Sequence, residues 1–71
     1  MSIAKIIGQN LKDARKAKGL TQKQVAKTML MTQQQYSRFE NGVFELNYQQ
    51  ICKLCNILDI TPNDLFVGCV D

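Results

Sequence analysis

The amino-acid sequence predicts an all-α fold, in which five short helices form one small domain. Three observations lead to this fold class: the chain has only 71 residues, its apolar residues recur at helical spacing without strand alternation, and helix-capping residues precede each periodic segment. A chain this short buries only about 60% of the surface that it exposes when unfolded. The hydrophobic content of 45% is nevertheless enough for one core. We therefore expect residues 1–71 to be a single domain that folds alone or as a small oligomer.

Capping residues place the start of each helix. In a capping box, the N-cap side chain and the side chain three residues later each accept a hydrogen bond from the other residue's backbone N–H. Two pairs match this pattern, and a third matches it more weakly: Thr21 with Gln24, Thr32 with Gln35, and Asn47 with Gln50. Thr61 and Pro62 supply an N-cap and a proline at the first helical position, and Asp64 an acid near the positive end of the helix dipole. The first helix is expected to begin near Ser2.

Helix ends and apolar stripes complete the assignment. Gly19 and Gly42 close the first and third helices, and Asp59 takes the exit of the fourth, where Gly or Asn is commoner. Apolar stripes run along the first and fourth helices through Ile3, Ile7, Leu11 and Ala14, and through Tyr48, Ile51, Leu54, Cys55 and Leu58. The sequence therefore predicts helices over approximately 2–17, 22–29, 33–41, 48–58 and 62–67.

The net charge of +3 is divided unevenly along the chain. Residues 1–38 carry eight Lys and Arg against a single acid, Asp13, which makes this half +7, whereas residues 39–71 sum to −4. Such a polarity favours an N-terminal half that faces a polyanion. The alternative is a solvated, lysine-rich face without a partner.

Composition excludes several other classes of function. No apolar stretch approaches the length of about 20 residues that a membrane span needs, and the first residues do not have the basic-then-apolar pattern of a leader. The three thiols of Cys52, Cys55 and Cys69 fall short of the four ligands of a structural zinc site, and histidine is absent. There is also no Gly-rich phosphate loop. We expect a cytoplasmic protein with no catalytic site, metal, cofactor, membrane contact or small-molecule substrate.

Residues 21–41 have the outline of a helix-turn-helix, since two capped helices are joined by roughly three residues. The small side chain of Ala26 allows the two helices to cross closely. Their apolar contacts are expected from Val25, Met29, Met31, Tyr36 and Phe39. The second helix then turns outward the side chains of Gln33, Gln34, Ser37 and Arg38. Gln can bind N6 and N7 of adenine, and Arg can bind O6 and N7 of guanine. This face therefore predicts base recognition, with solubilising glutamines as the alternative.

At this point the chain resembles the Cro/repressor-like (XRE-type) helix-turn-helix family over residues 7–66. The resemblance is carried by Ile7-Gly8, Leu11 to Arg15, Lys18-Gly19-Leu20-Thr21-Gln22, Val25-Ala26, Thr32 to Gln34, Arg38, Phe39-Glu40-Asn41-Gly42, Ile51 to Leu54 and Thr61-Pro62-Asn63-Asp64-Leu65. It implies a compact, five-helix, lambda-repressor-like DNA-binding domain. The implied function is a sequence-specific transcriptional regulator, expected to be a repressor, that binds a palindromic operator in double-stranded DNA as a homodimer.

The resemblance also implies roles for individual residues. The third helix would enter the major groove, with Thr32 at its start, Gln33 and Gln34 reading bases, and Ser37 and Arg38 on the same face. Gln22 would touch a phosphate and brace Gln33. Asn41 and the backbone amides of residues 43–46 would contact phosphates. Arg15 and Glu40 would form a partly buried structural ion pair. The alternative is that Arg15 binds a phosphate and Glu40 is a surface acid.

Three positions depart from the family pattern. Leu30 stands where the turn usually has Gly, which implies either a different turn or backbone strain. Tyr36 replaces Ile or Val, so its hydroxyl is expected to reach solvent or a partner. Val43 and Phe44 replace basic residues, and Phe44 is expected either in the core beside the fourth helix or exposed on the loop.

Dimerisation is expected through the fourth and fifth helices and the tail, where apolar residues exceed the needs of one core: Ile57, Ile60, Phe66, Val67 and Val70. The competing interpretation is a protein-interaction module, such as an antitoxin or anti-repressor. A protein-binding descendant of this fold would be expected to lose the basic half or the polar third helix. This chain retains both, which favours DNA.

Overall fold

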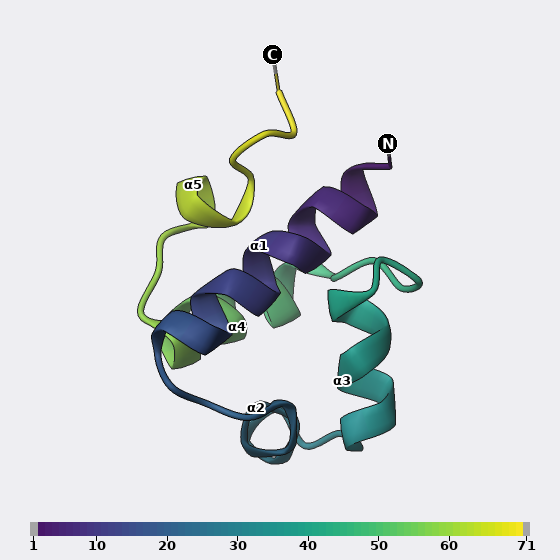
Figure 1. Ribbon diagram of the computed structural model, residues 1–71, viewed down its shortest axis with the longest axis vertical. Helices are drawn as coiled ribbons and strands as arrows, with labels where there is room; N and C mark the ends of the chain where they lie inside the picture. Colours follow the sequence, from purple (N-terminus) through teal and green to yellow (C-terminus); the bar gives the residue numbers. More distant parts are fainter. Residues whose placement is uncertain (1, 71) are drawn as a thin grey trace.

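Five helices enclose one core in the computed structural model, which describes residues 2–70 (Figure 1). In chain order they are α1 (Ile3–Ala17), α2 (Gln22–Thr28), α3 (Gln33–Glu40), α4 (Tyr48–Leu58) and α5 (Pro62–Leu65). Over this range the chain forms no strand, so the all-α, five-helix prediction is confirmed. α1 contacts both α3 and α5, α2 packs on α3, and α4 packs on α5.

The cap residues begin the helices where the sequence predicts. Thr21, Thr32, Asn47 and Thr61 each accept a hydrogen bond from the backbone N–H three residues on, and each capping box is complete. Ser2 caps α1 by accepting from the Lys5 amide. These contacts lie within a few residues of chain, which is why local sequence suffices to find them.

The helix ends differ from prediction mainly at α5, which stops at Leu65 rather than at residue 67. Asn10 of α1 donates its side-chain amide to the carbonyl oxygens of Leu65 and Val67, at 2.8 Å in both cases. The chain then turns at Gly68, where φ is +89°. A contact with α1, fifty-five residues away, thus replaces the next helical turn. Asp59 ends α4 with φ of +56°, as expected of a left-handed C-cap.

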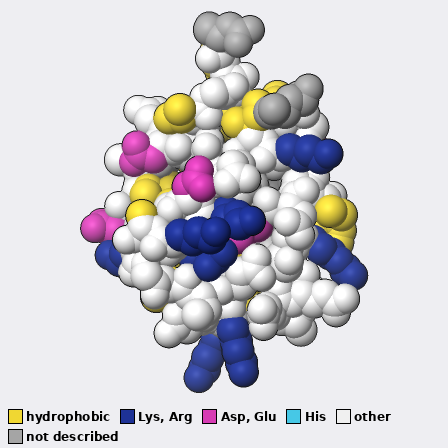
Figure 2. All heavy atoms as spheres, viewed as in Figure 1, with side chains coloured by type: hydrophobic (Ala, Val, Ile, Leu, Met, Phe, Trp, Pro, Cys, Tyr) yellow, Lys and Arg dark blue, Asp and Glu magenta, His cyan; other side chains and the backbone are white. Residues whose placement is uncertain are grey.

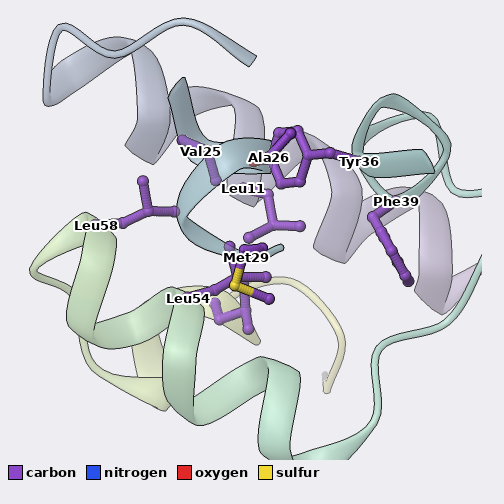
Figure 3. Close-up of a cluster of buried hydrophobic side chains, with 9 residues drawn as sticks. Leu11, Val25, Ala26, Met29, Tyr36, Phe39, Leu54 and Leu58 are labelled. Atoms are coloured by element: carbon purple, nitrogen blue, oxygen red, sulfur yellow. The ribbon is translucent and has the colours of Figure 1, made fainter. Parts of the chain in front are cut away.

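The core lies between α1, the α2–α3 pair and α4 (Figure 3). The largest side chains that are fully buried are those of Leu11, Val25, Tyr36, Leu54 and Leu65. Two residues on the predicted apolar stripes are instead exposed: Ile3 by 59% and Tyr48 by 89%. Both stand in the first turn of their helices, and a periodic pattern identifies a helix face without showing how far along it the core extends.

Ile3 and Tyr48 border an apolar groove of about 310 Å³. Its other apolar lining includes Ile7, Phe44, Ile51 and Phe66, so the groove joins the start of α1 to the loop before α4 and to the residue after α5.

No helix within residues 2–70 has both the length and the apolar content to cross a bilayer.

Candidate nucleic-acid interface

The turn between α2 and α3 sets the crossing of the two helices. Ala26 is buried, and its carbonyl oxygen accepts the Met31 amide at 3.0 Å. Leu30 adopts φ of +59°, the left-handed conformation that glycine tolerates best. Of the two alternatives, a different turn or a strained residue, the structure has the strained one. The Leu30 side chain is 87% exposed, so no burial compensates for that strain.

The outward face of α3 presents two free amides. Gln33 and Gln34 are exposed, and neither side chain hydrogen-bonds elsewhere in the described chain. The third glutamine differs, because Gln35 Oε1 accepts the Thr32 amide at 2.9 Å and the Thr32 hydroxyl accepts the Gln35 amide. The capping box therefore occupies Gln35 and Thr32, and leaves the two intervening amides available to a ligand.

The last turn of α3 carries Ser37, Arg38 and Asn41. Asn41 Nδ2 donates to Ser37 Oγ at 3.3 Å, so these two polar side chains pair with each other. The exposed guanidinium of Arg38 lies over the ring of Phe44, 5.5 Å from its centroid. Arg38 and Gln34 are four residues apart and share one helix face.

Arg15 and Glu40 form a bidentate ion pair between α1 and α3. Arg15 Nε donates to Glu40 Oε2 at 2.7 Å, and the second hydrogen bond to Glu40 Oε1 measures 3.2 Å. Arg15 also donates to the Leu20 carbonyl oxygen, which ties in the segment before α2. Both side chains are buried. Through these contacts Arg15 links α1 to α3 and to the segment that leads into α2.

Gln22 binds the same carboxylate. Its Nε2 donates to Glu40 Oε1 at 3.0 Å, and residues 2–70 show no hydrogen bond from Gln22 to Gln33. Gln22 thus donates to a buried, charged and therefore strong acceptor, and its expected brace on Gln33 stays a prediction. Burial on its own would raise the pKa of Glu40, but the Arg15 guanidinium, the nearby Tyr36 hydroxyl and the hydrogen bond from Gln22 together outweigh burial and lower that pKa.

Tyr36 is fully buried beside this ion pair. Its hydroxyl oxygen has no hydrogen-bond partner among residues 2–70, so the expectation that it reaches solvent or a partner is wrong. Burial raises the pKa of Tyr36 far above its ordinary value, and the nearby Glu40 carboxylate adds to that effect. The phenol therefore stays neutral and serves as a core side chain.

In the loop after α3, only some of the backbone amides expected to bind phosphates are free to do so. The amides of Val43 and Phe44 both donate to the Arg38 carbonyl oxygen, at 2.9 and 3.3 Å. These two donors are already satisfied, which leaves the amides of Glu45 and Leu46 as candidates. Phe44 itself is 42% exposed and meets the ring of Phe39 edge-on, at a centroid separation of 5.8 Å. Of the two alternatives, exposure on the loop is therefore correct, although part of the Phe44 ring packs against Phe39.

Basic side chains surround the helix-turn-helix. Figure 2 shows Lys and Arg side chains projecting at the end occupied by α2 and lying over α1, with acidic side chains mostly toward α5. The lysines of α2, Lys23 and Lys27, are exposed, as are Lys5, Lys16 and Lys18. The described residues contain no group of three or more metal-binding side chains, and all three cysteines are free thiols.

Comparison with known families agrees with this geometry. A model of the helix-turn-helix family matches residues 11–65, from the middle of α1 to the end of α5. The chain belongs to this family. The resemblance noted in the sequence is thereby confirmed. The helix-turn-helix of the family corresponds to α2 and α3, and α3 carries the exposed glutamines.

Two curated relatives come from Bacillus subtilis (strain 168). The HTH-type transcriptional regulator YqaE is 35% identical over 63 residues, which are 89% of this chain and 54% of the relative. The SPbeta prophage-derived HTH-type transcriptional regulator YonR is 33% identical over 63 residues, which are 89% of this chain and 58% of the relative. The chain thus spans a little over half the length of these relatives.

Solved structures share the fold. The restriction-modification controller protein C.AhdI from Aeromonas hydrophila is 35% identical, with a TM-score of 0.77 over 84% of this chain and 87% of that one. The clp gene regulator ClgR from Corynebacterium glutamicum superposes with a TM-score of 0.89 over 100% and 96% of the two chains. At 20% identity, ClgR is evidence for the fold alone.

Proposed function

We propose that this chain binds double-stranded DNA as a homodimer and regulates transcription, as a repressor acting at a palindromic operator. The observation that carries the proposal is the face of α3, where Gln33, Gln34 and Arg38 are exposed together on a helix locked to the rest of the domain through Glu40. Membership of the helix-turn-helix family and the regulators among its relatives support it.

The chemistry of this face suits the major groove. In a helix-turn-helix, the first residues of the second helix reach the base edges, and the first helix crosses the backbone. Gln33 and Gln34 occupy the first turn of α3, and each amide can donate to N7 and accept from N6 of an adenine. Their freedom from intramolecular hydrogen bonds means that DNA binding breaks none.

Exposed lysines on α1 and α2 would supply sequence-independent affinity. Each phosphate that a Lys or Arg neutralises releases counterions, so the logarithm of the affinity falls with the logarithm of the salt concentration by about 0.9 per contact. A dimer neutralising about 6 to 10 phosphates would show a correspondingly steep salt dependence. A flat dependence would mean that these lysines form only a solvated surface.

The surface proposed for dimerisation is the tail together with the groove. Phe66, Val67 and Val70 are 38, 64 and 85% exposed, and Phe66 lines the groove. Ile57 and Ile60 are partly buried against the core, and their expected contribution to the interface stays a prediction. Two-fold symmetry would place the half-sites about one helical turn, ~34 Å, apart.

The test starts from a pool of random-sequence DNA duplexes, because the operator is unknown. Wild-type protein selects its preferred duplex, and Gln33→Ala and Gln34→Ala are then titrated against the selected and a scrambled duplex. Each variant should lose about 1 to 3 kcal/mol of binding free energy on the selected duplex and almost none on the scrambled one. Gln49→Ala removes an exposed glutamine from α4 and serves as the matched control.

Three outcomes would overturn parts of the proposal. Equal weakening on both duplexes would make the glutamines backbone contacts. Enrichment of no duplex, with folded protein, would instead favour the protein-interaction module. Sedimentation of a monomer, both free at high concentration and on the selected duplex, would remove the dimer.

A further inference from the structure

Three side chains form a continuous stack from the core to the exposed face of α3. Phe39 is buried, with 8% of its surface exposed, and the Phe44 ring meets it edge-on at an interplanar angle of 66°. The Arg38 guanidinium lies over the Phe44 ring, 5.5 Å from the centroid. This separation is within the range of about 6 Å over which a cation is attracted to an aromatic face.

The backbone fixes Phe44 relative to Arg38. The amides of Val43 and Phe44 both donate to the Arg38 carbonyl oxygen, so the loop folds back onto the residue that its aromatic ring contacts. Gly42 makes this reversal with φ of +73°. A Cβ at Gly42 would lie 2.7 Å from Lys5 Cα, which shows how closely the loop is held against α1.

We propose that Phe44 is a positioning residue for DNA recognition, because it holds the Arg38 guanidinium ready to bind a pair of acceptor atoms on DNA. The inference rests on the proposed function of α3. The contact with the ring is a cation–π attraction, and no residue within 2–70 accepts a hydrogen bond from the Arg38 guanidinium, so its N–H donors remain available for bidentate hydrogen bonds. Such acceptor pairs are O6 and N7 of guanine or two phosphate oxygens. A long side chain that is already ordered loses less freedom when it binds.

The test is a double-mutant cycle on the duplex that the wild-type protein selects. Phe44→Leu keeps an apolar side chain but removes the aromatic face, and should weaken binding about three- to fivefold. Phe44→Tyr retains the ring and should bind within about twofold of wild type. In an Arg38→Ala background, Phe44→Leu should have no further effect, because its contribution acts through the guanidinium.

The source of the acceptor pair is distinguished by modified DNA. Replacing guanines one at a time by 7-deazaguanine removes N7, and replacing single phosphates by methylphosphonates removes a charge. A modification that weakens binding by the wild-type protein but not by Arg38→Ala identifies the group on DNA that Arg38 binds. Titrations are run at a temperature where thermal melts show every variant to be folded.

The outcomes separate this inference from the proposed function. If Phe44→Leu weakens the Arg38→Ala protein as much as it weakens wild type, Phe44 acts on the loop and the inference is overturned. It is also overturned if Arg38→Ala binds normally while Gln33→Ala is still weakened, and in that case the proposed function of α3 stands. If the wild-type protein prefers no duplex at all, the proposed function itself fails.

Discussion

The two ends of α3 are held in opposite ways. At the C-terminal end, Glu40 is buried in an ion pair with Arg15, and a Cβ added at Gly8 of α1 would lie 2.6 Å from the Phe39 carbonyl oxygen. Backbone thus lies directly on backbone where α1 crosses this end of the helix. This contact with α1, together with the packing of α2 on α3, fixes the orientation of α3.

At the N-terminal end, the side chains of the first turn of α3 are exposed. Thr32, Gln33 and Gln34 are all exposed, and the turn before them contains the strained, exposed Leu30. The difference shows how a short helix can be both rigid and accessible. The helix is held where the protein buries it, so the other end can project into solvent with the Gln33 and Gln34 side chains unpaired.

The largest expected effect comes from breaking the ion pair at the buried end. Glu40→Ala leaves the Arg15 guanidinium buried without its partner and should lower the free energy of unfolding by about 3 to 5 kcal/mol. Urea titration measures this loss. Glu45→Ala, which removes an exposed loop carboxylate, is the matched control and should change stability by no more than about 0.5 kcal/mol.

A double variant sharpens this test. Arg15→Met with Glu40→Leu removes both charges, and should be much more stable than Glu40→Ala, because no buried charge is stranded. If the double variant is as unstable as the single one, the loss comes from packing or from the Gln22 hydrogen bond rather than from an unpaired charge.

The next largest effect should follow from Gly8→Ala. Alanine normally favours a helix over glycine, but here the added methyl would meet the carbonyl groups of Phe39 and Glu40. We expect a loss of about 3 kcal/mol in unfolding free energy, from overpacking against backbone that cannot move away. Gly19→Ala is the control, since nothing lies within 4 Å of its Cβ position. Only the strain of its positive φ remains there, at about 1 kcal/mol. Equal losses in the two variants would show that close approach of α1 to α3 is not what holds the helix.

A smaller effect should appear on acidification. The pKa of Glu40 is lower in the folded protein than its ordinary value of 4.5, so its contribution to stability is complete above that pH. As the pH falls from 4.5 through the folded-state pKa, the contribution is lost. Comparing urea titrations of wild type and Glu40→Gln over this range isolates it from the other carboxylates. Parallel acid dependence in the two proteins would contradict the assignment to Glu40.

The sequence predicts the features that depend on neighbouring residues and misses those that depend on residues far apart in the chain. The capping boxes at Thr21 and Thr32 and the helix exit at Asp59 depend on neighbours in the chain, and all three are found as expected. Gln22 and Glu40 are eighteen residues apart, and nothing local indicates that they bind each other. The exposure of Ile3 and Tyr48 likewise depends on where the core ends rather than on periodicity. The placement of Phe44 under Arg38 depends on how the loop folds back, which composition does not encode.

The smallest expected effect lies at the exposed end, in the Leu30→Gly variant. A left-handed conformation costs an L-residue about 1 to 2 kcal/mol, and glycine avoids this cost. Glycine also gives the unfolded chain more freedom, which offsets about 0.5 to 1 kcal/mol of the gain. Since the Leu30 side chain is 87% exposed, little burial is lost. Leu30→Gly should therefore raise the free energy of unfolding by about 0.5 to 1 kcal/mol in urea titration.

Leu30→Ala separates the two causes at this turn, because alanine retains the strain at φ of +59° while removing the side chain beyond Cβ. It should show no gain in stability, and the order of stability should be Gly above both Leu and Ala. If glycine destabilises the protein, Leu30 makes a stabilising contribution that outweighs its strain, and the exposed end of α3 is held more firmly than its contacts indicate. If glycine stabilises the fold without weakening binding to the selected duplex, the strain at Leu30 serves neither the orientation of α3 nor its access to DNA, and the buried contacts of α3 with α1 and α2 determine how the helix is presented.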